Sequence, residues 1–221
     1  MNEYMKGKKG YGNYQPSFMH AHDLITGRGP YETASLCSCG YDADTGLFTL
    51  PSLSETLTVS YPECEVLFSG TDTAPVADWR LVVLHYLGTA SGVMPSGELA
   101  HFRQMPGGRA YESAFDNRSV SILEKTICPL PIDTVKGICL SLGGKVKDSG
   151  SADVQAEFLF APLLTITLQV WLTGEDDIAG GGGVSILFDK RASYIVPTED
   201  MAVAASLLAR FIMKECGSAR P

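Results

Sequence analysis

The sequence lacks two features that would place the protein in a membrane or on a nucleic acid. Its longest apolar runs are far shorter than the roughly 20 residues that a helix needs to cross a bilayer. Basic residues are also scarce, because 17 Lys and Arg stand against 25 Asp and Glu and give a formal net charge of −8. Affinity for a phosphate backbone depends largely on basic patches that release counterions. We therefore expect no membrane partner and no nucleic-acid partner.

The cysteine patterns of metal sites and disulfide scaffolds are missing too. None of the six cysteines forms a C-x-x-C pair, and only Cys37 and Cys39 lie close together in the sequence. Structural zinc and iron–sulfur sites usually draw on such pairs, so we predict no metal and no other cofactor. The N-terminus is polar where a secretory signal has an apolar core, and scattered cysteines suit a reducing compartment. These features predict a cytoplasmic protein.

Common catalytic motifs are missing as well. The sequence has no G-x-S-x-G elbow for a serine nucleophile. The tetraglycine Gly180–Gly183 is not a phosphate-binding loop, because the Lys-Ser/Thr ending is missing and an apolar strand pattern follows instead of a helix. It predicts a flexible hairpin connection, and the acidic "GEDD" before it predicts a solvated turn. Motifs therefore do not decide whether the protein is an enzyme.

What the sequence does contain is a run of alternating strands between groups of helices. In residues 153–160 and 163–172 the even-numbered positions are apolar, whereas most odd-numbered positions are polar. Such alternation predicts an antiparallel hairpin with one face in the core. The other predicted elements are helices at 17–26, 30–39, 75–89, 107–128, 131–144 and 197–213, and strands at 55–61, 63–68, 96–103 and 184–189.

This order of elements predicts an α+β fold, with a mostly antiparallel sheet and helices packed on one face. We expect residues 1–16 to form a flexible N-terminal tail and residues 17–221 to form a single α+β domain. The odd-numbered face of the hairpin would then meet water or a partner. It carries Trp171, whose indole is a large and rigid contact surface and makes it a candidate binding residue. Its companions on that face are Gln155, Glu157, Thr165, Thr167 and Gln169.

Two histidines have neighbours that raise the question of function. His85 lies inside the apolar run "LVVLHYL", where a hydrogen-bonded core histidine is the favoured interpretation and a ligand role is the alternative. His101 and Arg103 are two residues apart on a predicted strand and would share one face. There they could receive a carboxylate or phosphate, although a simple ion pair of Arg103 with an acidic residue is the plainer interpretation. Tyr111 follows shortly after them.

Several longer motifs together carry a family resemblance. They include the "HYL" helix, "SGE" with "FR", the "GG" before Tyr111, "WLTGEDD", "LFD" and "PTED". With these motifs the chain resembles the prokaryotic family called domain of unknown function 3786, over roughly residues 20 to 215. The resemblance implies an origin in anaerobic bacteria or methanogenic archaea and marks Arg103, Tyr111, Trp171 and Asp189 as candidate site residues. Some relatives resemble fusions to a four-cysteine iron–sulfur module of corrinoid proteins, and this sequence has no such module.

Three hypotheses for the function follow. The first is a cytoplasmic binding or accessory protein, linked through the family resemblance to corrinoid or one-carbon metabolism, whose partner is another protein or an anionic small molecule. The second is an enzyme that acts on an anionic small molecule with a His/Arg pair, with His101 or His85 as the base. The third is a structural domain that forms a homodimer through the open face of the sheet. Convergence of His85, His101, Arg103 and Asp189 in one pocket would favour the enzyme.

Overall fold

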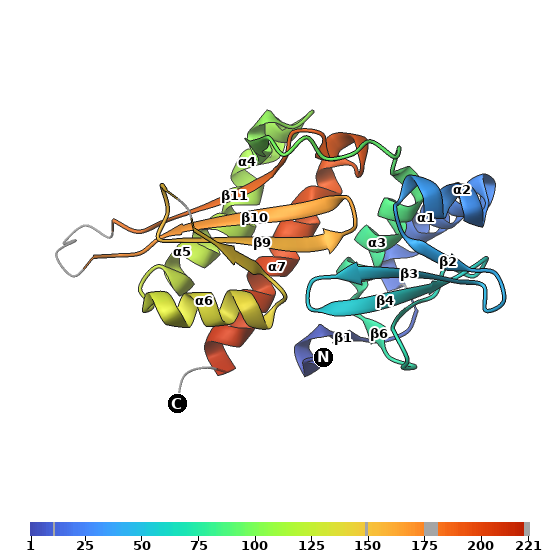
Figure 1. Ribbon diagram of the computed structural model, residues 1–221, viewed down its shortest axis with the longest axis horizontal. Helices are drawn as coiled ribbons and strands as arrows, with labels where there is room; N and C mark the ends of the chain where they lie inside the picture. Colours follow the sequence, from blue (N-terminus) through green and yellow to red (C-terminus); the bar gives the residue numbers. More distant parts are fainter. Residues whose placement is uncertain (11, 149, 175–180, 219–221) are drawn as a thin grey trace.

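Two antiparallel sheets, each covered by helices, lie side by side in the molecule (Figure 1). The computed structural model describes residues 1–10, 12–148, 150–174 and 181–218. It confirms the α+β class, the antiparallel pairing of the strands and the packing of helices against one face of the central hairpin. The second sheet is an addition to what the sequence predicted.

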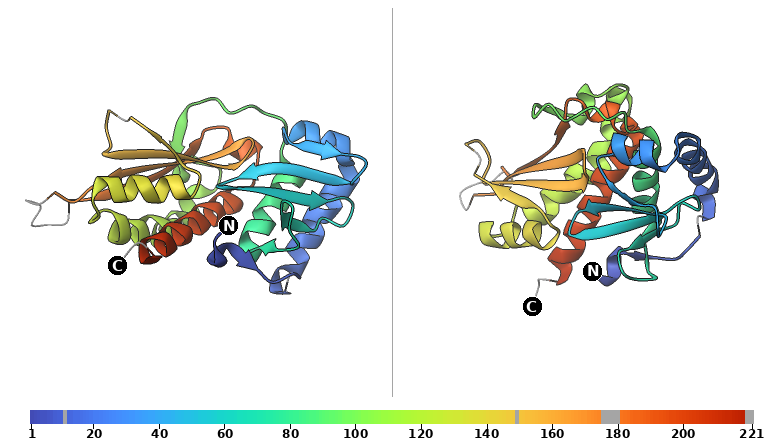
Figure 2. Two further views of the ribbon diagram at one scale, coloured as in Figure 1. Left: turned by 60° about the horizontal axis from the view of Figure 1, so that its bottom comes forward. Right: turned by 45° about the vertical axis from the view of Figure 1, so that its right-hand side comes forward.

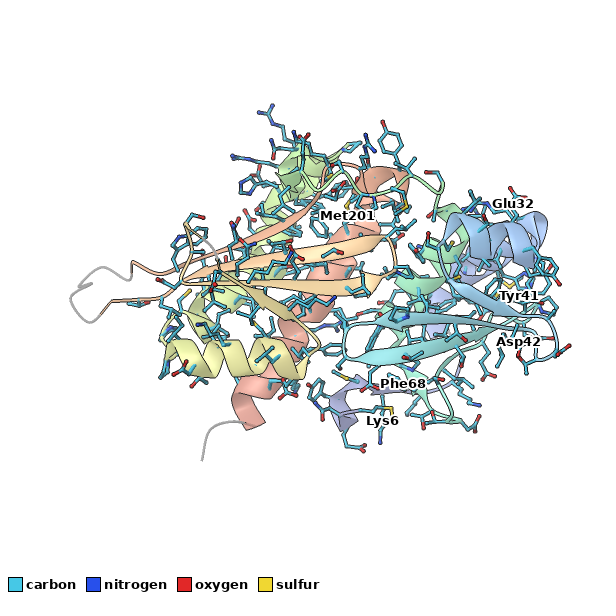
Figure 3. All side chains as sticks on the ribbon, viewed as in Figure 1. Lys6, Glu32, Tyr41, Asp42, Phe68 and Met201 are labelled. Atoms are coloured by element: carbon cyan, nitrogen blue, oxygen red, sulfur yellow. The ribbon has the colours of Figure 1, made fainter. Side chains whose placement is uncertain are left out.

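The larger sheet has five strands in the order β7-β11-β10-β9-β8. Its centre is the predicted hairpin, in which Leu168 of β10 pairs with Ala156 of β9. The even-numbered side chains of this hairpin are buried, and helices α5 (Ser121–Ile127) and α7 (Thr198–Ser218) lie behind them (Figure 1). The fully buried Met201 of α7 is labelled among the side chains in Figure 3. The strands are β7 (Leu99–His101), β8 (Lys145–Lys147), β9 (Val154–Ala161), β10 (Leu164–Trp171) and β11 (Gly183–Asp189).

The second sheet has four strands in the order β2-β3-β4-β5, next to helices α1, α2 and α3 (Figures 1 and 2). Sequence periodicity found β4 and β5, although β5 begins three residues later than predicted, and it missed β2 and β3. The missed strand β3 contains Pro51, which lacks a backbone N–H and is disfavoured inside a sheet. The elements are α1 (Gln15–Arg28), α2 (Pro30–Leu36), β2 (Gly40–Asp42), β3 (Leu47–Ser52), β4 (Glu55–Ser60), β5 (Val66–Phe68) and α3 (Ala77–Thr89).

A buried hydrogen-bond chain joins the two sheets. The Trp79 indole N–H donates to the Ser52 hydroxyl over 2.8 Å, and that hydroxyl donates to the Phe160 carbonyl over 2.6 Å. Both Trp79 and Ser52 are fully buried, so each polar group needs the partner that it has. Phe68, Phe160 and Phe211 contact the Trp79 ring. The core therefore runs continuously from one sheet to the other.

The first ten residues lie against the rest of the chain, in contrast to the flexible tail predicted for residues 1–16. Met5 is almost fully buried, and β1 (Lys6–Gly7) pairs with β6 (Ala74–Pro75) in a two-stranded sheet. Polar and glycine-rich composition suggested a tail, because periodicity cannot detect a two-residue strand anchored by one methionine.

The helix predicted at 107–128 is present but interrupted. It consists of α4 (Gly108–Phe115), a π-helical turn η4 (Asp116–Val120) and α5 (Ser121–Ile127). Two further helices agree with the predictions, α6 (Ile132–Ser141) and α7 (Thr198–Ser218). In the described part of the chain no helix combines the length and apolar character needed to span a membrane.

The strand predicted at 96–103 is shorter than expected. It ends at His101, and a 3-10 turn η3 (Phe102–Gln104) follows. The argument that His101 and Arg103 share one strand face is therefore wrong, since Arg103 lies outside the strand. The Gln104 side-chain oxygen accepts a hydrogen bond from the His101 backbone N–H at 2.8 Å and helps to start the turn.

The hairpin connection predicted from the glycine run is confirmed by the pairing of Trp171 with Gly183. Residues 175–180, which include all three acidic residues of "GEDD", lie outside the described residues, so the predicted solvated turn is not described. Gly182 is not merely a spacer, because a Cβ at this position would lie 2.6 Å from the Cys128 Cβ. At least one glycine of the run is therefore fixed by close packing.

Candidate ligand-binding site

A pocket of about 340 Å³ opens between helices α3, α4 and α7. Helices α4 and α7 each present one stripe to it, with residues spaced i, i+3, i+4 and i+7 as expected for one helix face. The α4–η4 stripe is Tyr111, Ala114, Phe115 and Arg118, and the α7 stripe is Glu199, Ala202, Val203 and Ser206. Tyr14, Asp78, Leu81 and Phe102 complete the lining. Ligand sites typically combine an apolar lining with a few polar groups, as here.

A stacked aromatic pair forms a wall of this pocket. The Phe102 and Phe115 rings have centroids 4.2 Å apart and an interplanar angle of 2°. On its other side the same pair borders a second pocket of about 220 Å³, which His101, Arg103 and Glu112 also line. The two pockets are therefore neighbours that share one aromatic wall.

The π-helical turn η4 contributes to both pockets. Arg118 lines the first pocket, whereas Asp116 and Val120 line the second. A π turn places an extra residue in a helical turn and often occurs at functional sites. Without it, the side chains of α4 and α5 would be rotated differently around the helix axis. Sequence periodicity did not predict this turn.

The charged groups of the first pocket differ in how they are paired. Asp78 forms an ion pair with Arg210. The negative charge of Asp78 and its hydrogen bond raise the pKa of Tyr14 above its ordinary value. The side chains of Arg118 and Glu199 form no hydrogen bond or ion pair with the described residues, and both are exposed at the border of the pocket. Two exposed charges of opposite sign, neither of them paired with a described side chain, therefore border one apolar cavity.

The second pocket brings together His101 and Arg103, as the sequence suggested, although by a turn and not by one strand face. The Arg103 guanidinium lies 3.7 Å from the Glu112 carboxylate and so forms the predicted ion pair. Burial, followed by the charge of Glu112, raises the pKa of Asp116, against the opposing effect of Arg103. The pocket therefore holds a basic pair whose charge is partly compensated by two carboxyl groups.

His85 lines neither pocket, and its side chain is paired with Asp200. Its Nδ1 lies 2.8 Å from Asp200 Oδ2, and this contact joins α3 to the first turn of α7. Burial lowers the pKa of His85, but the Asp200 carboxylate more than offsets this effect and the pKa is raised. The Ser17 backbone acts on the pKa in the same direction, and the buried Nε2 has no hydrogen-bond partner within the described part of the chain. This environment is that of a structural histidine.

Asp189 also has several partners. Its carboxylate accepts hydrogen bonds from the backbone N–H groups of Gly97 at 2.7 Å and Arg191 at 2.8 Å, and from the Ser96 hydroxyl at 3.1 Å. Burial would raise the pKa of Asp189, but these donors together lower it. The carboxylate thus fixes the loop before β7 to the end of β11.

The side chains of Trp171 and Tyr111 are more exposed than those of the core aromatic residues. Trp171 is half-buried, and its indole N–H donates to the Ser151 carbonyl, so part of its own chain covers it. Thr167 on the same face is almost fully buried, and the face is therefore less open than predicted. Tyr111 is 51% exposed and lines the first pocket. Of the six predicted site residues, His101 and Arg103 meet in one pocket and Tyr111 borders the other.

Sequence reasoning missed Arg118, Glu199, Tyr14 and Asp78. One signal could have pointed to the helix faces, since Tyr111–Arg118 and Glu199–Ser206 both follow helical spacing. Among the described residues no group of three or more His, Cys, Asp or Glu side chains could hold a metal ion. Burial raises the pKa of the Cys37 and Cys39 thiols, which disfavours the thiolate form that binds metals.

Fold and site together define an α+β protein with a ligand-sized pocket between its helices. The chain belongs to the family described as Domain of unknown function (DUF3786), which it matches over residues 29–211. The matched segment contains every residue named for the first pocket except Tyr14. No curated protein and no solved structure matches the chain.

Proposed function

We propose that this protein is a binding protein for a compact organic anion with an apolar body, held in the pocket between α3, α4 and α7. The observation that carries the proposal is the guanidinium of Arg118 at the border of an apolar cavity, where none of the described side chains pairs with it. Burying apolar surface stabilises a bound ligand, and a guanidinium matches the geometry of a carboxylate or phosphate. At about 340 Å³ the cavity lies at the lower end of the usual range of about 300–1,000 Å³, which suits a compact molecule and not a whole corrinoid.

The proposed setting follows from the sequence and the family resemblance. We place the protein in the cytoplasm of an anaerobic prokaryote, in an accessory role connected with corrinoid or one-carbon metabolism. The family match supports the resemblance on which this setting rests.

An enzyme is the second candidate, and one observation favours it. His101 and Arg103 line one pocket, next to the proposed binding pocket. However, Arg103 is already paired with Glu112, while His85 and Asp189 are engaged elsewhere by Asp200 and by the 96–97 loop. These contacts therefore do not support the convergence of His85, His101, Arg103 and Asp189 in one pocket, which would have favoured an enzyme.

Isothermal titration with octanoate and 3-phenylpropionate tests the binding proposal. We expect at least one of these anions to bind to the native chain. Ala202→Trp should abolish binding by filling the pocket, whereas Met213→Trp, which adds the same ring elsewhere on α7, should not. Arg118→Gln should weaken binding about tenfold, as expected for a loss of about 1.4 kcal/mol. Arg109→Gln removes an exposed arginine from α4, the helix that leads into η4, and should have no effect. Equal binding by Ala202→Trp and the native protein would refute the site.

A further inference from the structure

The side chains of Arg118 and Glu199 lie at opposite ends of the pocket. The Thr198 hydroxyl donates to the Pro106 carbonyl at 2.8 Å, so α7 begins beside the start of α4. Farther along, α7 contacts η4 and α5, and the two helical runs therefore lie side by side in the same direction (Figures 1 and 2). Glu199 and Tyr111 therefore begin the α7 stripe and the α4–η4 stripe at one end of the pocket. Ser206 and Arg118 end the two stripes at the other end.

Helix α3 confirms this order from the third side. It runs antiparallel to α7, because Asp78 pairs with Arg210 whereas His85, farther along α3, pairs with Asp200. Asp78 therefore lies at the Arg118 end, where Arg210 compensates its charge. With Arg118 added, that end carries one net positive charge. At the other end Asp200 is paired with His85, so Glu199 is the carboxylate of the lining that has no side-chain partner among the described residues.

The groove between these ends is apolar and about 10 Å long. Glu199 and Ser206 are seven positions apart on α7, and a helix rises about 1.5 Å per residue, which gives roughly 10 Å. The side chains between the two ends are mainly Ala114, Phe115, Ala202 and Val203. Neither charged end can neutralise the other across this distance, so each is available to a ligand that spans the groove.

We propose that the pocket takes a linear molecule with an ammonium group at one end, a carboxylate at the other and an apolar chain between them. The ammonium group binds Glu199 and the carboxylate binds Arg118. An extended chain advances about 1.2 Å per bond, so about eight bonds span the roughly 10 Å between the two ends. This inference rests on the proposed function and specifies its ligand class as an ω-aminocarboxylate of about eight carbons.

A chain-length series measured by isothermal titration tests the inference. The probes are glycine, 4-aminobutanoate, 6-aminohexanoate and 8-aminooctanoate, with octanoate and octylamine as matched molecules that carry one charge each. We expect affinity to rise along the series to its maximum at six to eight carbons. 8-Aminooctanoate should bind at least fivefold more tightly than octanoate and octylamine. Equal or tighter binding of octanoate would overturn the inference and leave the proposed function standing.

Substitutions of Glu199 and Arg118 test the binding of the ammonium group separately from the binding of an organic anion. Glu199→Gln should lower the affinity for 8-aminooctanoate to that for octanoate, while octanoate binds as it does to the native chain. Arg118→Gln should weaken both molecules. If Glu199→Gln leaves the preference for 8-aminooctanoate intact, the ammonium end is assigned wrongly. If none of the single-charge or double-charge probes binds, both this inference and the binding of an organic anion in this pocket are refuted.

Discussion

The imidazole of His85 and the carboxylate of Asp200 form a partly buried pair that ties α3 to the beginning of α7, with His85 Nδ1 2.9 Å from Oδ1 and 2.8 Å from Oδ2. The same two helices form two walls of the proposed pocket. Leu81 lies one helical turn before His85, and Glu199 directly precedes Asp200, so both residues of the pair adjoin residues of the pocket lining. The pair is therefore placed to hold the pocket together without taking part in binding.

Replacing His85 should reveal a pH-dependent contribution to stability. The pKa of His85 is raised above its ordinary value of 6.5, so its stabilising effect is fully present below that value and is lost as the pH rises through the folded-state pKa. His85→Gln should cost about 2 kcal/mol at pH 6, in the range for a hydrogen bond to a charged group, and less at pH 9. Urea denaturation at both pH values measures the difference. His20→Gln, at an exposed histidine, serves as the control, and an equal cost at both pH values would contradict the charged pair.

Replacing Asp189 should destabilise the edge of the larger sheet in the opposite pH range. The pKa of Asp189 is lowered by its hydrogen-bond donors despite burial, so the stabilisation is present above the ordinary value of 3.8 and is lost as the pH falls through the folded-state pKa. Asp189→Asn should cost about 2 kcal/mol at pH 7 and less near pH 3. Denaturation curves of the variant and of the exposed-site control Asp44→Asn measure this. A variant as stable as the native chain at pH 7 would show that the loop needs no carboxylate.

The two tryptophans should differ in what their removal costs. Trp79 is fully buried, so Trp79→Ala should lower the free energy of unfolding by about 3–5 kcal/mol. Trp171 is half-buried and covered only in part by Ser151, so Trp171→Ala should cost clearly less. Denaturant midpoints compare the two variants. Sedimentation of Trp171→Ala also tests the dimer hypothesis, because a native dimer that dissociates in the variant would identify this face as its interface.

Two helical glycines should respond in opposite ways to alanine. At Gly108, the first residue of α4, a Cβ would lie 2.1 Å from the Phe102 carbonyl oxygen, so Gly108→Ala should destabilise the protein and displace the start of α4. At Gly137 of α6 a Cβ meets no atom within 4 Å, and Gly137→Ala should stabilise the helix by about 0.5–1 kcal/mol. Thermal denaturation compares both with the native chain. A neutral Gly108→Ala would mean that the η3–α4 corner is loosely packed.

The sequence by itself determined the α+β class, the β9–β10 hairpin with its buried even-numbered face, and the approximate extent of most helices. These features depend on local periodicity, which follows from the geometry of a strand or helix and can be read along the chain. The sequence also predicted that Arg103 forms an ion pair and that His85 is hydrogen-bonded. It did not identify their partners, Glu112 and Asp200. The family was also predicted from the sequence, and the family match over residues 29–211 confirms it.

Only the tertiary structure decided where the pocket lies and which charges border it. Arg118 and Glu199 are far apart in the sequence, and their stripes face one cavity only because α4 and α7 pack side by side. The π turn at 116–120 and the burial of Met5 likewise depend on packing against distant segments. A stripe of residues shows which face of a helix is special, but the choice of neighbour is a long-range contact, and local pattern carries no information about it.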